Sequence, residues 1–312
     1  MNVVLLFPGQ GSQKPGMGRD LVEAFPPARD TFAAVDAALG ESLSTLCFDG
    51  PADALTQTHN AQPALLAHGA AVWATVRDRV GPHVRAAAGH SLGEFTAYHA
   101  ASAFDLATGA LLVRRRGELM LESGDKRPGT MAAILGDVAG GIEAVCAEAS
   151  RESGCVVPAN YNSPGQVVIS GEIAAVERAM ELAKAAGAKR AIRLNVSGAF
   201  HSPLMAVARD GLEQALGSAG LRDPAFPVYA NVTAEPVRTG SDARRLLVEQ
   251  LTAPVAWTRL VERLAADHPD ALYVEMGPGN VLVGLVKKIA PSLQTVTCGT
   301  AAEVEQLLSR VA

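Results

Sequence analysis

The sequence predicts a mixed α/β protein in which helices cover a mostly parallel sheet. Towards both ends of the chain, short apolar runs alternate with longer segments of helical periodicity. In the middle, about 65 residues follow the order strand, helix, strand, strand, helix, strand, which is typical of a ferredoxin-like unit. We therefore expect a large α/β domain of residues 1–125 and 198–312, interrupted by a ferredoxin-like subdomain of residues 126–197.

The composition of the chain excludes several classes of protein. Its 312 residues suggest roughly two domains, and a hydrophobic content of 48% with 19% charged residues excludes a disordered chain. The formal net charge is −5, and no basic run exceeds Arg114-Arg115-Arg116, which argues against nucleic-acid binding. No apolar run approaches the ~18 residues of a membrane span. The N-terminus lacks the charged region of a signal peptide, so we expect no membrane partner and a cytoplasmic location.

The four cysteines point to neither a metal site nor a disulfide framework. Cys47, Cys146, Cys155 and Cys298 have no CxxC spacing. We interpret them as reduced thiols of a cytoplasmic protein, and we expect no metal.

The N-terminal part of the chain begins with a buried strand at residues 2–7. This run is continuously apolar, starts with β-branched residues and is closed by Pro8-Gly9. A Gly-rich loop follows at residues 10–19, and then a helix. The further elements expected in this part are a helix at 63–79, a strand at 84–89, and helices at 92–103 and 105–123.

The central unit is bounded by turn-rich segments at 124–129 and 197–198, which favours an insertion. Its expected strands are 130–135, 155–160, 166–170 and 189–196, and its expected helices are 141–151 and 172–186. The large domain then resumes with a helix at 203–218, a strand at 227–232, two helices, a strand at 272–276, a helix, a strand at 295–298 and a last helix.

The motif Gly89-His90-Ser91-Leu92-Gly93 is a GxSxG between an expected strand and an expected helix. That context is typical of a nucleophile elbow, a turn so tight that only glycine fits at both ends. The serine would then lie at a helix N-terminus, where backbone N–H groups stabilise an oxyanion. The alternative is an ordinary strand–helix turn.

A serine nucleophile needs a base, and the chain has seven histidines. The side chain of His90 leaves the turn in another direction, and His99 lies about 12 Å along the following helix. His201 lies where the chain re-enters the large domain, and a loop at such a junction can bring a residue to the elbow. An ordinary loop histidine remains the alternative at this point.

Two further polar residues are candidates for the site. Gln10 lies in the Gly-rich loop after the first strand, where it could help to bind an oxyanion. This loop matches neither GxxxxGK[ST] nor GxGxxG, so it is not a phosphate-binding loop. Arg116 lies among apolar residues on a helix, so one of three consecutive arginines must face inward or sideways. A surface turn and a solvated helix face are the respective alternatives.

Several motifs in this order resemble those of malonyl-CoA:acyl-carrier-protein transacylases and of the acyltransferase domains of polyketide synthases. They are FPGQGSQ at 7–13, GHSLGE at 89–94, Arg116-Gly117, Phe200-His201-Ser202, QLTAPVAW at 250–257 and GPGN at 277–280. The resemblance covers nearly the whole chain. It implies a large domain like that of the α/β hydrolases with a ferredoxin-like insert.

The resemblance also implies a role for each site residue. Ser91 would carry the malonyl group as an ester, and His201 would be the general base, oriented by the main-chain carbonyl of Gln250. Gln10 and the Leu92 N–H would form the oxyanion hole, and Arg116 would hold the malonyl carboxylate. The residues that the resemblance places around the substrate are Phe200, His90, Asn160 and Asn162.

The implied reaction takes malonyl from malonyl-CoA to the phosphopantetheine thiol of an acyl carrier protein, with no bound cofactor and in a monomeric enzyme. Two rivals are an acyl-thioester hydrolase on the same serine and a non-catalytic module that docks carrier proteins. A hydrolase has no use for Arg116, and intact Ser91 and His201 argue against the module. Ala199-Phe200-His201 resembles the signature of malonyl-using polyketide enzymes, but fatty-acid synthesis would use the same site.

Overall fold

The computed structural model describes residues 1–311 and confirms the mixed α/β class. Its larger sheet has six strands in the order β10-β9-β1-β2-β7-β8. These strands are β1 (Val3–Phe7), β2 (Val84–Gly89), β7 (Val228–Tyr229), β8 (Pro236–Val237), β9 (Leu272–Glu275) and β10 (Gln294–Thr297). All neighbours are parallel except β7 and β8, which pair antiparallel at the edge.

Strand β1 is central because every residue in it is apolar and both faces of the sheet are covered. Val3, Leu5 and Phe7 point into one core cluster, and Val4 and Leu6 point into another on the opposite face. All five side chains are buried, as expected for a parallel strand that is covered on both sides. The carboxyl ends of β1 and β2 therefore meet at one edge of the sheet, where the Gly-rich loop and the GxSxG turn begin.

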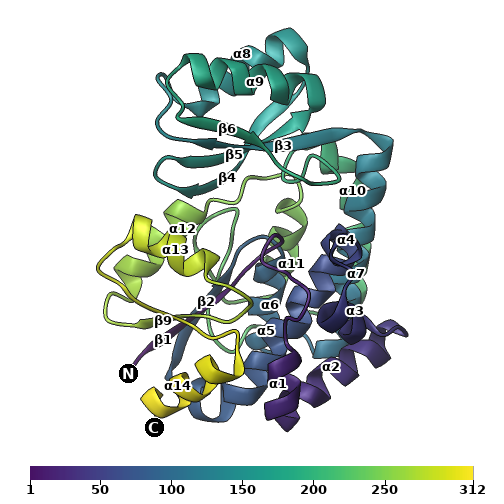
Figure 1. Ribbon diagram of the computed structural model, residues 1–312, viewed down its shortest axis with the longest axis vertical. Helices are drawn as coiled ribbons and strands as arrows, with labels where there is room; N and C mark the ends of the chain where they lie inside the picture. Colours follow the sequence, from purple (N-terminus) through teal and green to yellow (C-terminus); the bar gives the residue numbers. More distant parts are fainter. Residues whose placement is uncertain (312) are drawn as a thin grey trace.

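Helices cover both faces of this sheet (Figure 1). These helices are α1 (Arg19–Ala24), α2 (Pro26–Leu39), α3 (Leu43–Asp49), α4 (Ala52–Thr56), α5 (Thr58–Val80), α6 (Leu92–Ala100), α7 (Leu106–Lys126), α10 (Ala206–Ser218), α11 (Gly240–Glu249), α12 (Trp257–Asp267), α13 (Val281–Ile289) and α14 (Ala301–Val311). Helices α5 and α7 are among those that pack into the core cluster of Val3, Leu5 and Phe7, and α12 and α13 pack into the smaller cluster on the opposite face.

A second, four-stranded sheet lies beyond the first, at the top of Figure 1, with the strand order β4-β5-β3-β6. Its elements are β3 (Gly129–Leu135), α8 (Ile142–Ser153), β4 (Val156–Ser163), β5 (Gln166–Glu172), α9 (Ile173–Ala185) and β6 (Arg190–Arg193). All of its strand pairs are antiparallel, and a separate apolar cluster joins the sheet to α8 and α9. The expected order of strands and helices in this segment is confirmed.

The edge strand β4 connects the two sheet layers. The Tyr161 N–H donates to the Val255 carbonyl oxygen at 2.9 Å, and the Val255 N–H donates to the Ala159 carbonyl oxygen at 2.8 Å. These bonds hold Asn160 and Asn162 over the loop that begins at the end of β2.

Several segments differ from the expectations. Helix α5 begins at Thr58 and includes Pro63, whereas we expected a helix that begins at residue 63, because the polar residues before it show no apolar periodicity. Helices α3 and α4 and strand β8 were not expected, and the single helix expected after the Gly-rich loop is two helices, α1 and α2. Strand β7 is only two residues long. Beyond it, the Ala230 N–H donates to the Glu235 carbonyl oxygen at 3.1 Å, and the Asn231 N–H donates to the buried Glu94 carboxylate at 3.1 Å. In the described residues, no helix combines the length and apolarity that crossing a bilayer requires.

Candidate active site

The turn between β2 and α6 has the geometry of a nucleophile elbow. Ser91 has φ 52° and ψ −108°, a backbone conformation that residues other than glycine rarely adopt. A Cβ at Gly89 would lie 1.9 Å from the Gly93 carbonyl carbon, and one at Gly93 would lie 2.0 Å from the Phe7 carbonyl oxygen. The two glycines of the motif are therefore required by close packing, as expected from the sequence.

His201 is the histidine that the fold brings to Ser91. Its Nε2 lies 2.7 Å from Ser91 Oγ, and its Nδ1 lies 2.8 Å from the Gln250 carbonyl oxygen. A carbonyl only accepts, so Nδ1 carries the proton and Nε2 is left to accept from the serine hydroxyl. His201 itself has φ 56°, so the loop before α10 is held in a strained conformation at this point.

The environment of His201 favours the neutral imidazole. His201 is 3% exposed, and burial together with the nearby Arg116 charge lowers the pKa of its imidazole to about 3. The imidazole is therefore neutral at physiological pH, which is the form that a general base needs.

Two main-chain N–H groups remain free beside Ser91. Within residues 1–311, neither the Leu92 N–H nor the Gln10 N–H donates to a protein acceptor. Leu92 is the first residue of α6, and both residues line the same cavity as Ser91. The side-chain oxygen of Gln10 is occupied, since it accepts a bond of 2.9 Å from the Thr58 hydroxyl.

Arg116 is the inward-facing member of its arginine triplet and is 1% exposed. Its Nη2 lies 3.1 Å from Ser91 Oγ and 2.8 Å from Gln250 Oε1, and its Nη1 lies 2.6 Å from Gln62 Oε1. These three acceptors are neutral oxygens, and the Nε–H has no partner in the described part of the chain. A buried guanidinium with a free donor beside the serine is suited to bind an anion.

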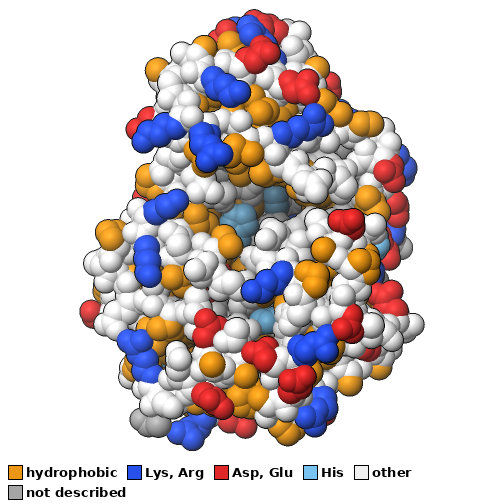
Figure 2. Space-filling view, viewed as in Figure 1, with side chains coloured by type: hydrophobic (Ala, Val, Ile, Leu, Met, Phe, Trp, Pro, Cys, Tyr) orange, Lys and Arg blue, Asp and Glu red, His pale blue; other side chains and the backbone are white. Residues whose placement is uncertain are grey.

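The cavity above Ser91 has a volume of about 190 Å³ and lies between the two sheet layers. Figure 2 shows its opening, with histidine side chains at the floor. Every site residue expected from the sequence lines it except Gln250, which lies behind the wall and is fully buried. Those lining residues are Gln10, His90, Ser91, Leu92, Arg116, Asn160, Asn162, Phe200 and His201. His90 Nε2 lies 2.8 Å from Asn162 Oδ1, so His90 faces away from the serine.

Sequence reasoning missed three polar residues behind the cavity: Gln62, Glu94 and Asn231. Gln62 accepts from Arg116, and Glu94 Oε2 accepts from Gln250 Nε2 at 2.7 Å. Asn231 Oδ1 accepts from the Ser91 N–H and its Nδ2 donates to the Gly89 carbonyl oxygen, both at 2.7 Å. Glu94 at least stands in the GHSLGE motif, whereas no local signal marks Gln62 or Asn231.

We expect Asn231→Asp to weaken the elbow. A carboxylate cannot donate to the Gly89 oxygen, and it would lie close to the Glu94 carboxylate. Leaving a buried acceptor unpaired should lower the free energy of unfolding by about 1–3 kcal/mol. The loss should shrink as the pH falls, because a protonated Asp regains the donor. Urea unfolding at several pH values measures this, with Asn280→Asp at an exposed position as the control. Equal effects of the two substitutions would contradict the role of Asn231.

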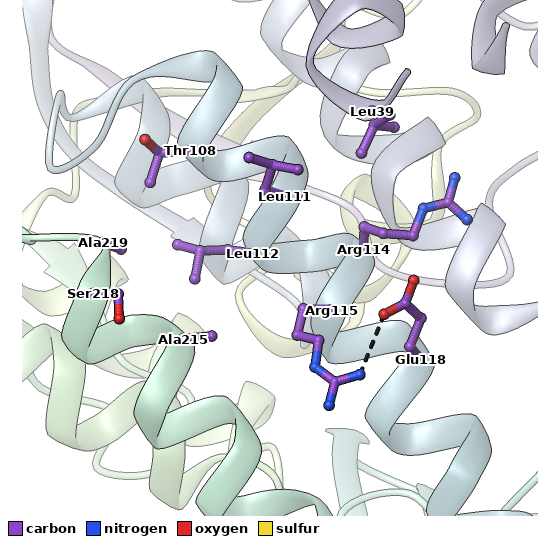
Figure 3. Close-up of a pocket in the computed structure, with 10 residues that line it drawn as sticks. All are labelled: Leu39, Thr108, Leu111, Leu112, Arg114, Arg115, Glu118, Ala215, Ser218 and Ala219. Carbon is purple, nitrogen blue, oxygen red and sulfur yellow. Dashed lines mark hydrogen bonds and ion pairs between the residues drawn. The ribbon is translucent and has the colours of Figure 1, made fainter. Parts of the chain in front are cut away.

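A larger groove, of about 630 Å³, lies away from this site between α7 and α10 (Figure 3). Its lining contains the Arg115–Glu118 ion pair and apolar side chains such as Leu111, and no histidine.

The four cysteines are free, and three of them are buried. Among residues 1–311, no group of three or more His, Cys, Asp or Glu side chains is placed to hold a metal ion.

Comparisons with known proteins agree in one family. The pattern of the acyl transferase domain matches residues 4–306. The malonyl CoA-acyl carrier protein transacylase of Bacillus subtilis is 43% identical over 97% of this chain and 95% of its own. The enzyme of the same name from Escherichia coli K12 is 44% identical over 92% of this chain and 93% of its own.

Solved structures show the same similarity. The acyl-carrier-protein-S-malonyltransferase of Bartonella henselae superposes with a TM-score of 0.94 at 42% identity, covering 100% of this chain and 99% of its own. A malonyl-transacylase solved in complex with a type II PKS acyl-carrier protein superposes with a TM-score of 0.95 at 40% identity, covering 99% and 100%.

Proposed function

Since this chain belongs to the acyl transferase domain family, we propose that its buried serine–histidine–arginine site moves malonyl groups between thiols. The enzyme is a malonyl-CoA:acyl-carrier-protein transacylase. It takes the malonyl group from malonyl-CoA and delivers it to an acyl carrier protein. The single observation that carries the proposal for the site is the placement of the Arg116 guanidinium 3.1 Å from the Ser91 hydroxyl, with both residues lining one cavity.

In the first half-reaction, Ser91 Oγ attacks the thioester carbonyl while His201 Nε2 takes the hydroxyl proton. The negative oxygen of the tetrahedral intermediate is bound by the free N–H groups of Leu92 and Gln10. The carbon–sulfur bond then breaks, His201 returns the proton to the leaving thiolate, and CoA departs as the thiol. The Gln250 carbonyl holds the imidazole and favours its cationic form between these two steps.

In the second half-reaction the phosphopantetheine thiol of the carrier protein attacks the malonyl ester, and His201 takes the thiol proton. Collapse of the second intermediate breaks the bond to Ser91 Oγ, which recovers the proton from His201. Thioester, ester and thioester are close in free energy, so the protein has to stabilise the two tetrahedral intermediates. Water competes with the thiol for the same ester, and the narrow cavity limits its access.

Arg116 supplies the preference for malonyl. A malonyl carboxylate that entered the cavity unpaired would be costly to bury. The guanidinium already lies beside Ser91 and has a free Nε–H, so it offers a planar pair of donors to that carboxylate. Burial lowers the pKa of Arg116 to about 10, which still leaves the group charged at neutral pH.

We expect Arg116→Ala to lower kcat/KM for malonyl-CoA by about 100-fold, since a charged hydrogen bond contributes roughly 1.5–3 kcal/mol. Acetyl-CoA has no carboxylate, so its kcat/KM should stay unchanged or rise. Arg116→Lys should restore part of the malonyl rate only, because an ammonium cannot form two parallel bonds. The substitution Arg115→Ala on the exposed side of the same helix is the matched control. Equal losses on both substrates for Arg116→Ala would show that Arg116 is structural.

An acyl-enzyme assay with labelled malonyl-CoA tests the proposed activity against its rival. A transferase accumulates malonyl-enzyme that is discharged by holo acyl carrier protein. An acyl-thioester hydrolase instead releases free malonate with steady turnover, and that result would replace the proposal. If the protein is not labelled and malonyl-CoA is not turned over, both activities are contradicted.

We further propose that the parallel sheet and its helices form an α/β-hydrolase-like domain of residues 1–125 and 198–312, and that residues 126–197 form a ferredoxin-like subdomain. The strand order β4-β5-β3-β6 with α8 and α9 supports the second part. A monomeric state, a cytoplasmic location, and the absence of a bound cofactor, nucleic acid or membrane partner stay predictions.

A further inference from the structure

Glu94 is a fully buried carboxyl group behind the active site that the mechanism above does not use. It lies in the first turn of α6, three residues after the nucleophile. Both of its hydrogen bonds go to the same oxygen, Oε2, which accepts from Gln250 Nε2 at 2.7 Å and from the Asn231 N–H at 3.1 Å. The other oxygen, Oε1, has no partner within residues 1–311. The pocket around Glu94 can therefore hold either a carboxylate or a neutral acid with its proton on Oε1.

Only one amide separates Glu94 from Arg116. Gln250 Nε2 donates to Glu94, and Gln250 Oε1 accepts from Arg116 Nη2 at 2.8 Å. The charged group that acts on Glu94 is Arg116 from α7, and Glu94 in turn raises the pKa of Tyr98 on its own helix. Gln250 at the end of α11 and Asn231 after β7 present neutral amides. When it is ionised, Glu94 is thus an anion separated from the buried guanidinium by a single side chain.

The malonyl substrate changes the local charge balance because it brings a second anion to Arg116. With the carboxylates of both malonyl and Glu94 ionised, one guanidinium would face two negative charges in a buried site, which is unfavourable. Acetyl brings no charge and leaves the Arg116–Glu94 balance as it was. The two substrates therefore place different demands on the protonation of Glu94.

We infer that Glu94 is a specificity-determining acid that takes up one proton from solvent when the malonyl carboxylate pairs with Arg116. The carboxylate of Glu94 becomes a neutral carboxylic acid with the proton on Oε1, and its two existing bonds to Oε2 are kept. Burial raises the pKa of Glu94 to about 7, so this proton is available near neutral pH. As the pH rises above that value, ionised Glu94 opposes malonyl loading and leaves acetyl loading unaffected. This inference rests on the malonyl transfer proposed above.

The ratio of kcat/KM for malonyl-CoA to that for acetyl-CoA, measured for loading of Ser91, tests this inference. The ionisation of His201 and of the CoA phosphates affects both substrates alike and cancels in the ratio. For the unmodified protein, we expect the ratio to fall by roughly fivefold or more between about pH 6.5 and about pH 8.5. If the malonyl carboxylate raises the pKa of Glu94 by one unit, malonyl loading is about tenfold weaker with ionised Glu94 than with neutral Glu94. Glu94→Gln should remove this dependence and keep the ratio high. The amide oxygen can accept both existing bonds, and its NH₂ group takes the place of the unpartnered Oε1.

Glu249→Gln is the matched control, because Glu249 precedes Gln250 and pairs with Arg245 on the surface of the same helix. It should retain the pH dependence. A ratio with the same slope in the Glu94→Gln protein as in the unmodified protein would overturn the inference. If the unmodified protein forms no malonyl-enzyme at any pH, the proposed function fails instead, so the two outcomes remain distinct.

A binding measurement covers the case in which Glu94→Gln does not fold. The Ser91→Ala protein keeps Glu94 and cannot react, so calorimetry with malonyl-CoA in buffers of different ionisation enthalpy counts the protons taken up on binding. Near pH 7.5, somewhat above the pKa of about 7, we expect a fractional proton uptake with malonyl-CoA and none with acetyl-CoA. Equal proton uptake with both ligands, or none with either, would contradict the role of Glu94.

Discussion

Ser91→Ala should abolish labelling of the protein by malonyl-CoA and slow malonyl transfer on the order of 10³-fold or more, because the ester has no oxygen on which to form. The substitution removes only a hydroxyl group that bonds to His201 and Arg116. The backbone at this position is held by the Asn231 amide and by the glycines of the turn, which the variant retains. The variant should therefore keep the unfolding midpoint of the unmodified protein.

The measurement is the amount of labelled acyl-enzyme after rapid mixing with malonyl-CoA, together with a thermal unfolding curve. Ser170→Ala is the matched control, since Ser170 is fully buried in β5 and its hydroxyl group has no partner in the described residues. It should load normally. A Ser91→Ala protein that still accumulates malonyl-enzyme would show that the nucleophile is another residue.

The parts of the site that depend on neighbouring residues could be predicted from the sequence. The geometry of the GxSxG turn can be predicted locally, because the end of a β-strand, two glycines at the points of closest approach and the start of a helix all lie within a few residues. The apolar surroundings on α7 also indicate that one of the three consecutive arginines faces inward or sideways, whereas the choice of Arg116 rests on the motif resemblance. The order of strands and helices in residues 129–193 was predicted for the same reason, since each element carries its own periodicity.

The parts that depend on contacts between distant segments could not be predicted from periodicity. Asn231 lies 140 positions from Ser91, and its amide reaches the elbow only because β7 pairs with β2 and ends there. Gln62 bonds to Arg116 and Glu94 bonds to Gln250, each from a different helix, and such bonds have no periodicity in the sequence, although Glu94 does stand in the GHSLGE motif. The position of His201 in a loop at the domain junction makes it a candidate base, and only the motif resemblance connects its ring with the Gln250 carbonyl.

His201→Ala should slow loading of Ser91 by about 10³-fold, since a positioned general base contributes roughly 10²- to 10⁴-fold. The variant also loses the acid that protonates the departing thiolate, so both half-reactions should slow together. Because the pKa of His201 is held near 3, the imidazole of the unmodified protein is a neutral base throughout the neutral range. Loading with acetyl-CoA should therefore show no loss from His201 protonation between about pH 8 and about pH 5, in contrast with an unperturbed histidine.

The substitution His90→Ala tests whether loading of Ser91 requires a histidine at position 201 or only a histidine in the cavity. His90 lines the same cavity, but its Nε2 bonds to Asn162 and it does not contact the serine hydroxyl. Its replacement should alter substrate binding more than the loading rate at saturation. Added imidazole should restore part of the activity of His201→Ala, because the base can occupy the space between Ser91 Oγ and the Gln250 carbonyl. A larger loss for His90→Ala than for His201→Ala, with no rescue by imidazole, would assign the base to His90 and overturn the proton path through Gln250.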